Sequence, residues 1–189
     1  MTTPLSDRWT LDLPAWVTEV VADQPPPYAD DEAAMRLALT LARRNIVEGA
    51  GGPFGALVID RDSGDLIAAG VNCVFASGVS CAHAEIVALT LAHQATGHAD
   101  LGEPPALALI ASAEPCAMCL GATAWSGIRN LVIGARDTDI RAIGFDEGSK
   151  PPGWVEALAA RGISTRRDLL RDEASVVLRA YAERAGILY

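Results

Sequence analysis

Two short stretches of the sequence carry residues that can hold a metal ion and work on a metal-activated water. The first contains His83 and, two residues later, Glu85. The second lies about thirty residues further on, where Pro115 is followed by Cys116 and Cys119. One imidazole and two thiolates are ligands that zinc accepts, and they leave the fourth tetrahedral position for water, as in a catalytic rather than a structural site. Glu85 stands close enough to His83 to move protons to and from that water.

These residues meet only if the surrounding elements bring two helix starts together. Apolar residues predict a helix over 82–94, with His83 in its first turn. Residues 106–112 are apolar throughout, which is typical of a central strand. Pro115 fits the first position of the next helix, which places the two cysteines on one face of its first turn. A helix start lowers the pKa of a thiol and favours the metal-binding thiolate.

The remaining elements complete an alternation of helices and strands. Further helices are predicted from the acidic residues at 30–32 to Gly49, over 153–161 and over 172–185, and further strands over 56–60, 66–71, 130–135 and 163–166. The strands 56–60 and 66–71 flank a turn and form a hairpin. We therefore predict an α/β fold, a three-layer α/β/α sandwich with a mixed five-stranded sheet.

Residues 1–29 differ from the rest and are interpreted as an N-terminal extension that packs on the body. Three consecutive prolines at 25–27 exclude a continuous helix. Apolar residues such as Trp16, Val17 and Val20 are expected to cover the core and do no chemistry. Residues 30–189 then form one domain, which includes the C-terminal segment.

Composition narrows the classes of partner. The chain has 15 Lys and Arg against 24 Asp and Glu, a formal charge of −9, whereas nucleic-acid binders usually carry a basic footprint. The sequence has no stretch of about 18 apolar residues, so no membrane span is predicted. The N-terminus lacks an apolar segment behind a basic start, so we expect a cytoplasmic protein whose cysteines stay reduced.

Three local features have more than one interpretation from the residues alone. A closed four-cysteine zinc site would add Cys73 and Cys81, but their spacing is unusual for such a site and His83 and Glu85 would be unused. Asn72, at the end of a predicted strand, can hydrogen-bond a ligand or cap the next loop. The glycine-rich segment 51–55 permits close approach to a ligand or forms an ordinary loop.

The combination of His-x-Glu with Pro-Cys-x-x-Cys is a signature of zinc deaminases that act on nucleobases. From about residue 31 to its end, the chain resembles the cytidine deaminase-like superfamily. Free cytidine deaminases typically have Cys where His83 stands, and transfer-RNA adenosine deaminases share both motifs but are commonly basic. The segments 51–56, 82–85, 114–119 with Trp125 after it, and 143–148 resemble the bacterial guanine deaminases in order. The N-terminal extension resembles a subgroup that also accepts the triazine ammeline.

The resemblance implies hydrolysis of guanine to xanthine and ammonia in purine catabolism. His83, Cys116 and Cys119 would bind zinc, Glu85 would shuttle protons, and Glu147 would be a second catalytic carboxylate. Substrate contacts would come from Phe54, Asn72, Ala84, Trp125, Asp146 and Tyr189. The family also implies a homodimer in which the C-terminal segment, with Tyr189, can cover the partner's site.

Other functions stay open at this point. The chain can be a deaminase of another small aminated ring, such as ammeline, cytosine or a nucleoside. It can be a transfer-RNA adenosine deaminase that acts on an extruded base, although its acidity disfavours nucleic acid. A non-catalytic domain stabilised by zinc is the third alternative, but it has no use for Glu85.

Overall fold

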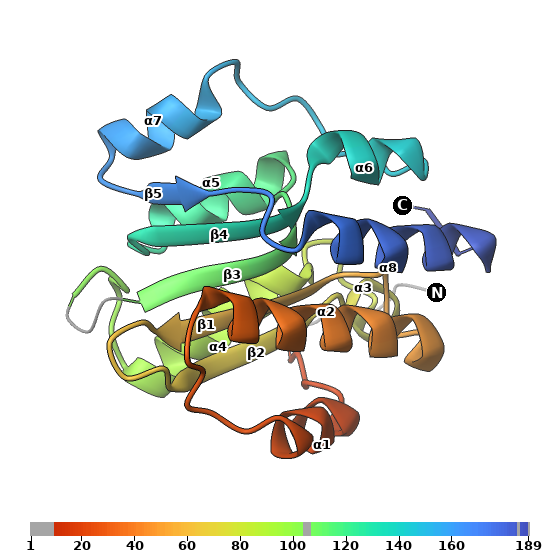
Figure 1. Cartoon of the computed structure of the whole chain (residues 1–189), viewed down its shortest axis with the longest axis horizontal. Coiled ribbons are helices and arrows are strands. Elements are labelled where there is room, and N and C mark those ends of the chain that lie inside the picture. The colour runs from red at the N-terminus through yellow and green to blue at the C-terminus, as the bar shows by residue number, and fades with distance from the viewer. Residues whose placement is uncertain (1–9, 104–106, 185, 189) are drawn as a thin grey trace, which may run out of the picture.

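A five-stranded sheet forms the centre of the computed structural model, which describes residues 10–103, 107–184 and 186–188 (Figure 1). The strands are β1 Gly55–Asp60, β2 Leu66–Val71, β3 Leu107–Ala113, β4 Asn130–Ala135 and β5 Ser164–Arg166, in the order β2-β1-β3-β4-β5. β1 runs antiparallel to β2 and β3, while β3, β4 and β5 are parallel. This arrangement confirms the predicted mixed sheet.

Eight helices are present in the described residues: α1 Ala15–Asp23, α2 Asp31–Glu48, α3 Val74–Ser77, α4 Ala84–Thr96, α5 Ala117–Trp125, α6 Asp137–Ala142, α7 Trp154–Ala160 and α8 Arg171–Glu183. α2 and α8 cover one face of the sheet, and α4 and α5 cover the other (Figure 1). The three-layer prediction is therefore confirmed.

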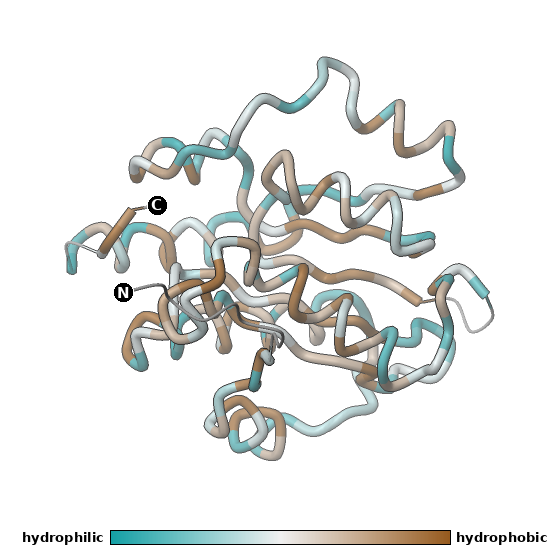
Figure 2. Tube along the Cα trace, turned by 180° about the vertical axis from the view of Figure 1, so that it is seen from behind, coloured by the Kyte–Doolittle hydropathy of each residue, from teal (hydrophilic) through white to brown (hydrophobic). Residues whose placement is uncertain are grey.

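Alternate residues of the strands feed two separate cores, as the period of two in a strand requires. In β1, Leu57 packs with the α2 side and Val58 with the α4 side. In β3, Ile110 faces the first core and Leu109 the second. Hydrophobic positions accordingly follow the central strands in Figure 2. Both faces of the sheet are buried, which explains the continuous apolar runs in the sequence.

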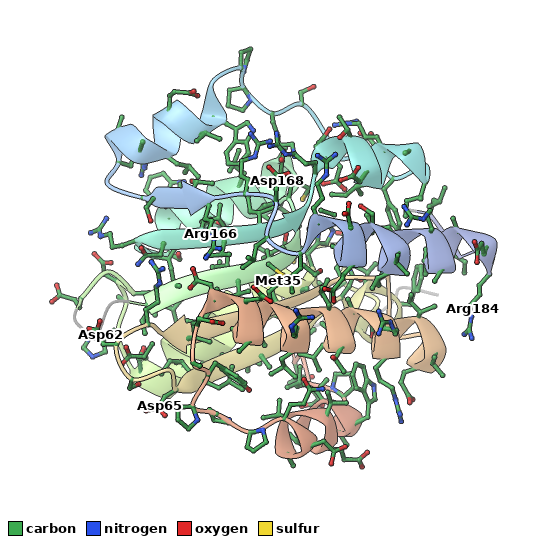
Figure 3. All side chains as sticks on the ribbon, in the orientation of Figure 1. Met35, Asp62, Asp65, Arg166, Asp168 and Arg184 are labelled. Carbon is green, nitrogen blue, oxygen red and sulfur yellow. The ribbon has the colours of Figure 1, made fainter. Side chains whose placement is uncertain are left out.

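Side-chain placement follows the same division between core and surface. Met35 lies between α2 and the sheet, whereas Asp62 and Asp65 lie at the turn between β1 and β2 (Figure 3). α2 begins where Asp30 Oδ1 accepts from the Ala33 N–H at 2.8 Å, and it ends at Gly49 in the left-handed region. Within the described residues, we find no helix long and apolar enough to cross a membrane.

Three short helices were not predicted from the sequence. α1 lies inside the segment expected to be an extension, and its Val17 is buried against the α2 side of the core. α3 has four residues and α6 has six, too few for a periodic apolar pattern to appear. α6 begins where the Asp139 carboxylate accepts from the Arg136 N–H at 2.8 Å.

Candidate active site

Two helix starts converge on the candidate metal ligands. His83 is the N-cap of α4 and Cys116 is the N-cap of α5, both in extended backbone conformations. The helices therefore begin one residue later than the two candidate ligands, and Pro115 precedes the cap of α5 instead of opening the helix. Cys119, three residues after Cys116, is buried in the first turn. The predicted convergence of two helix starts is present, with slightly shifted boundaries.

The ligand atoms of His83, Cys116 and Cys119 all lie within 4.8 Å of one another. Cys116 Sγ is 3.6 Å from His83 Nδ1. Within the described ranges, no other group of three His, Cys, Asp or Glu side chains is close enough to share an ion. One imidazole and two sulfurs are a donor set that zinc accepts, so the residues fit the metal.

The closed four-cysteine site is wrong. Cys73 lies in the buried core and its thiol contacts the Val71 carbonyl at 3.3 Å. Neither Cys73 nor Cys81 belongs to the group of potential ligands found in the described residues. All four cysteines are free.

The pKa values of the two candidate ligand thiols, Cys116 and Cys119, are shifted in opposite directions. A hydrogen bond from Cys119 lowers the pKa of Cys116 to about 4, and His83 acts in the same direction. The same bond, together with burial, raises the pKa of Cys119 well above its ordinary value. Burial opposes a charged imidazole, but the neighbouring Cys116 and Glu85 leave the pKa of His83 raised. One thiolate is thus already favoured, and a cation at the site favours the second.

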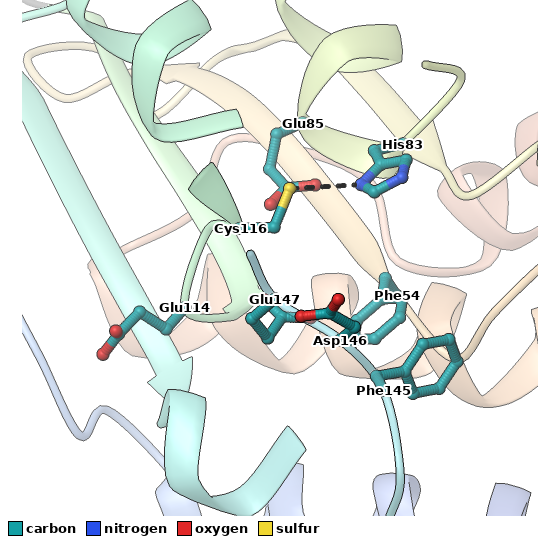
Figure 4. Close-up of a pocket in the computed structure, with 8 residues that line it drawn as sticks. All are labelled: Phe54, His83, Glu85, Glu114, Cys116, Phe145, Asp146 and Glu147. Atoms are coloured by element: carbon teal, nitrogen blue, oxygen red, sulfur yellow. Dashed lines mark hydrogen bonds between the residues drawn. The ribbon is translucent and has the colours of Figure 1, made fainter. Parts of the chain in front are cut away.

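Two buried carboxyl groups line the pocket beside these ligands. Glu85 lies in the first turn of α4, and Glu147 lies in the loop between α6 and α7 (Figure 4). Burial raises the pKa of Glu85, and the charge of Cys116 adds to this effect. Burial, Cys116 and Glu85 raise the pKa of Glu147 to about 8. Such groups can hold a proton near neutral pH and release it, as acid–base work requires.

Aromatic rings close the other side of the pocket. Phe54 and Phe145 meet edge to face with centroids 5.2 Å apart, and Tyr181 stacks on Phe145 at 5.8 Å. The free space in this partly open pocket is only about 30 Å³, room for water alone. A bound ring would therefore occupy the mouth of the pocket or displace its lining side chains.

Asn72 follows β2, is completely buried and is not among the residues that line the pocket. Its Oδ1 accepts from the N–H groups of Gly52 and Val74, each at 3.2 Å, while its Nδ2 has no partner among the described residues. A Cβ at Gly51 would lie 2.1 Å from Asn72 Oδ1, so only glycine fits there. The glycine-rich segment is thus more than an ordinary loop, because it holds the Asn72 amide in place.

The other expected substrate contacts do not share one placement. Asp146 lines the pocket, but its side chain is 86% exposed and pairs with Arg141. Ala84 is buried and is not among the pocket-lining residues. Trp125 is 83% exposed, with the Arg161 guanidinium 5.6 Å from its ring centroid. Tyr189 lies outside the described residues.

The expectation that Trp125 walls the ring is therefore wrong for the pocket of its own chain. α5 begins beside the pocket at its cap, Cys116, and Trp125 is its last residue, nine residues later. At about 1.5 Å per residue the helix has by then carried the chain more than 12 Å away. An aromatic residue close in sequence to a ligand is not close in space when a helix separates them.

Sequence reasoning missed two lining residues, Phe145 and Glu114. Phe145 stands in the segment 143–148 and had a signal, because it is an aromatic residue next to two acids in a loop. Glu114 precedes the Pro-Cys motif, but its side chain points away from His83 and Cys116 (Figure 4). Its carboxylate accepts from Lys150 at 2.8 Å and Arg167 at 2.7 Å, contacts that no local pattern predicts.

Comparison with known proteins agrees with this geometry. Residues 28–135 match the cytidine and deoxycytidylate deaminase zinc-binding region. A guanine deaminase of Bacillus subtilis is 38% identical over 116 residues, which cover 61% of this chain and 71% of that protein. The solved structure of a guanine deaminase from Nitrosomonas europaea is 46% identical, covers 96% of this chain and 100% of its own, and has a TM-score of 0.88. An asparagine-to-alanine variant crystallised with 8-azaguanine is 47% identical, with coverages of 94% and 98% and a TM-score of 0.88.

Proposed function

The chain belongs to the cytidine and deoxycytidylate deaminase family, and from this premise we propose that it hydrolyses the amino group of a free nucleobase. Guanine is the substrate, and xanthine and ammonia are the products. One observation carries the proposal: a His-Cys-Cys ligand set shares one small pocket with two buried carboxyl groups, Glu85 and Glu147. A purely structural metal site needs neither carboxyl.

Guanine is favoured over other bases by the relatives and by the second carboxyl. Similar proteins are a guanine deaminase of Nitrosomonas europaea and a variant that binds the guanine analogue 8-azaguanine. The reacting carbon of guanine lies between the two nitrogens of its six-membered ring, so its amino group is placed differently from that of cytosine or adenine. Glu147 supplies a second proton path to a leaving group in that position.

His83, Cys116 and Cys119 would hold zinc, which when bound supplies Lewis-acid chemistry and lowers the pKa of a water molecule toward neutrality. Glu85 accepts a proton from the attacking water and transfers it to a ring nitrogen. Water oxygen joins the carbon, and the carbon–nitrogen bond to the amine breaks after Glu147 has delivered a proton to that amine. The remaining hydroxyl proton then returns to Glu147 as the carbonyl of xanthine forms, so both carboxyl groups end as they began. The sum is one water consumed and one ammonia released.

Binding of the ring uses the aromatic lining of the pocket and the amide of Asn72, whose backbone N–H donates to the Phe54 carbonyl at 3.1 Å. The buried Nδ2 of Asn72 has donor capacity that no described residue uses, and an unsatisfied buried donor is costly unless a ligand pairs with it. Phe54 and Phe145 offer an apolar wall against which a planar base packs. Together they select an aromatic ring with an acceptor at its edge.

A panel of ammonia-release assays on the zinc-loaded protein tests the proposal. It contains guanine, adenine, cytosine, ammeline, guanosine and cytidine, and guanine should give the highest kcat/KM. A preference for cytosine, ammeline or a nucleoside would replace guanine and keep the reaction class. Salt-sensitive binding and deamination of transfer RNA would instead support a nucleic-acid enzyme, which the charge of −9 disfavours. No ammonia from any substrate would leave only a zinc-stabilised domain.

We also propose a homodimer that acts in purine catabolism in the cytoplasm. The four free cysteines are compatible with a reducing compartment. Trp125 and Met118 expose apolar surface on α5. Trp125 also lines a hollow together with Ile86, Leu89 and Ala122, and a second copy would cover this surface. Sedimentation analysis of the wild type and of Trp125→Ala tests this, because a dimer interface there should weaken in the variant.

The termini complete the proposal. Residues 30–189 form the deaminase domain, and residues 1–29 form an extension whose α1 packs on α2. The end of the chain, with Tyr189, covers the partner's site as a lid. Truncation after residue 184 tests the lid, since it should raise KM for guanine and leave the metal content unchanged.

A further inference from the structure

Lys150 is the only lysine of the chain, whose other 14 basic residues among the total of 15 are arginines. Its side chain is 8% exposed, whereas that of Arg167, which shares a partner with it, is 28% exposed. A charged group removed from water to this degree needs close oxygen partners to offset the lost hydration. The structure places such partners around its ammonium group.

Three oxygens surround Lys150 Nζ. It donates hydrogen bonds to Glu114 Oε1 at 2.8 Å and to the Pro115 carbonyl at 3.1 Å, and it forms an ion pair with Asp137 Oδ1 at 2.8 Å. A lysine ammonium carries three donors that radiate from one atom, whereas arginine presents a planar fork suited to paired oxygens. Three separate acceptors around one nitrogen therefore match lysine.

These contacts join segments that frame the pocket. Glu114 and Pro115 form the turn that leads into Cys116, and Asp137 is the first residue of α6. Lys150 ends the segment 144–150, which carries Glu147. The buried ammonium group of Lys150 thus connects the loop that carries Glu147 to the turn that precedes Cys116.

The same loop has two backbone attachments closer to Glu147. The Ala117 N–H donates to the Glu147 carbonyl at 3.0 Å, and Arg141 Nη2 donates to the Gly148 carbonyl at 2.7 Å. Both attachments lie at or before Gly148, so neither holds the far end of the segment. The contacts of Lys150, three residues beyond Glu147, hold that end.

Loss of Lys150 leaves each of the two carboxylates with one cation, although Glu114 Oε1, Asp137 Oδ1 and the Pro115 carbonyl lose their contact with the ammonium group. Glu114 Oε2 keeps Arg167 at 2.7 Å, and Asp137 Oδ2 keeps Arg141 at 2.7 Å. A neutral side chain at position 150 should therefore release the loop without stranding a buried carboxylate. The fold and the metal ligands should survive the substitution.

We propose that Lys150 is a positioning residue, which ties the segment 144–150 to the turn before Cys116 and thereby holds Glu147 in the pocket. This role rests on the proposed function for its effect on turnover, but the anchor itself is a property of the fold. A displaced proton donor lowers kcat more than it raises KM, because the Asn72 contact lies outside the loop and Phe145, at the other end of the segment, stays packed on Phe54 and Tyr181.

The test compares Lys150→Met and Lys150→Arg with Arg167→Met as the matched control. Arg167 contributes the other cation on Glu114 but does not belong to the acidic loop. Lys150→Met should lower kcat for guanine about 10- to 100-fold, with KM within about 3-fold and unchanged zinc content. Lys150→Arg should fall well below wild type too, because its fork cannot meet the three oxygens. Arg167→Met should stay within about 3-fold.

Amide exchange gives a readout that does not depend on activity. The Ala117 N–H is bonded to Glu147, so its exchange by NMR should accelerate in Lys150→Met and remain native in Arg167→Met. Native kcat, native Ala117 exchange, or equal damage in Lys150→Met and Arg167→Met would each overturn the role. If Lys150→Met does not fold, Lys150→Arg decides by the same two measurements. If wild type released no ammonia, the proposed function would fail, and Ala117 exchange would still decide whether Lys150 anchors the loop.

Discussion

Substituting Asp146 and Glu147 one at a time tests which of the two neighbouring carboxyl groups takes part in catalysis. Glu147 is buried in the pocket and Asp146 is 86% exposed, although the two are adjacent in sequence. Glu147→Gln keeps the size of the side chain and removes its ability to transfer a proton. Loss of general acid–base catalysis costs about 10²- to 10⁴-fold in rate. At about 1.4 kcal/mol per factor of ten, the barrier should rise by roughly 3 to 5 kcal/mol.

Asp146→Asn should do far less. The Asp146 carboxylate pairs with Arg141 at 3.6 Å on the surface, an interaction worth about 0 to 1 kcal/mol. The substituted amide keeps an oxygen that can accept from the Gly148 N–H, the present bond being 2.9 Å. The expected loss in kcat is therefore below about 5-fold, since 1.4 kcal/mol corresponds to a factor of ten.

Steady-state ammonia release from guanine, with zinc analysis and a thermal melt of each variant, measures both effects. Zinc content and melting temperature should match wild type in Glu147→Gln and Asp146→Asn, so that a rate loss reports chemistry. The reasoning is refuted if Glu147→Gln retains kcat within about 5-fold, or if the two variants lose equal activity. A larger loss in Asp146→Asn would move the second catalytic role to that residue.

Three further perturbations and metal removal test other parts of the structure. Glu85→Gln should keep zinc and lose about 10²- to 10⁴-fold in ammonia release, and normal turnover would contradict the proton shuttle. Chelation should abolish ammonia release and lower the melting temperature, both restored by Zn²⁺; activity in the metal-free protein would exclude the metal mechanism. Tyr181→Phe removes the hydrogen bond from the tyrosine hydroxyl to the Ile187 carbonyl at 2.7 Å, which is worth about 1 kcal/mol. Carboxypeptidase should then trim the C-terminus roughly 5-fold faster, and an unchanged rate would show that this bond does not hold the C-terminus. The hydrogen bond to Arg171 lowers the pKa of Asp139, so this carboxylate stabilises the fold above its ordinary pKa and loses its effect as the pH falls through the lowered value. Asp139→Asn should therefore melt at a lower temperature than wild type at neutral pH. A difference in melting temperature that persisted undiminished at about pH 3 would rule out the charge as its cause.

The metal ligands and Glu85 were predictable because their relations are local. His83 and Glu85 are two residues apart, and Cys116 and Cys119 are three apart, so a helix start fixes each pair without knowledge of the rest. The strands were equally readable, since burial on both faces leaves continuous apolar runs. Local spacing and burial are properties that a single sequence expresses directly.

The anchors of the site were not predictable, because their partners lie far apart in the chain. Lys150 meets Glu114 across 36 residues, and Arg167 reaches the same carboxylate across 53. Nothing in the neighbourhood of Lys150 distinguishes it from a solvated lysine, which is the usual fate of that residue type. The prediction for Trp125 went wrong for the opposite reason. Trp125 is close to Cys116 in sequence, but the length of α5 separates the two residues in space.

The two halves of the metal site also bear on the stability of the fold. Cys116 and His83 are separated by 33 residues that include all of β3, so closing that loop in an unstructured chain costs about 3 kcal/mol before any ligand meets another. α4 and α5 pack on the same face of the sheet, so the folded sheet holds the two helix starts together. A metal ion bound by His83, Cys116 and Cys119 would therefore close a loop whose ends the fold already holds, and its binding free energy would add to the free energy of unfolding.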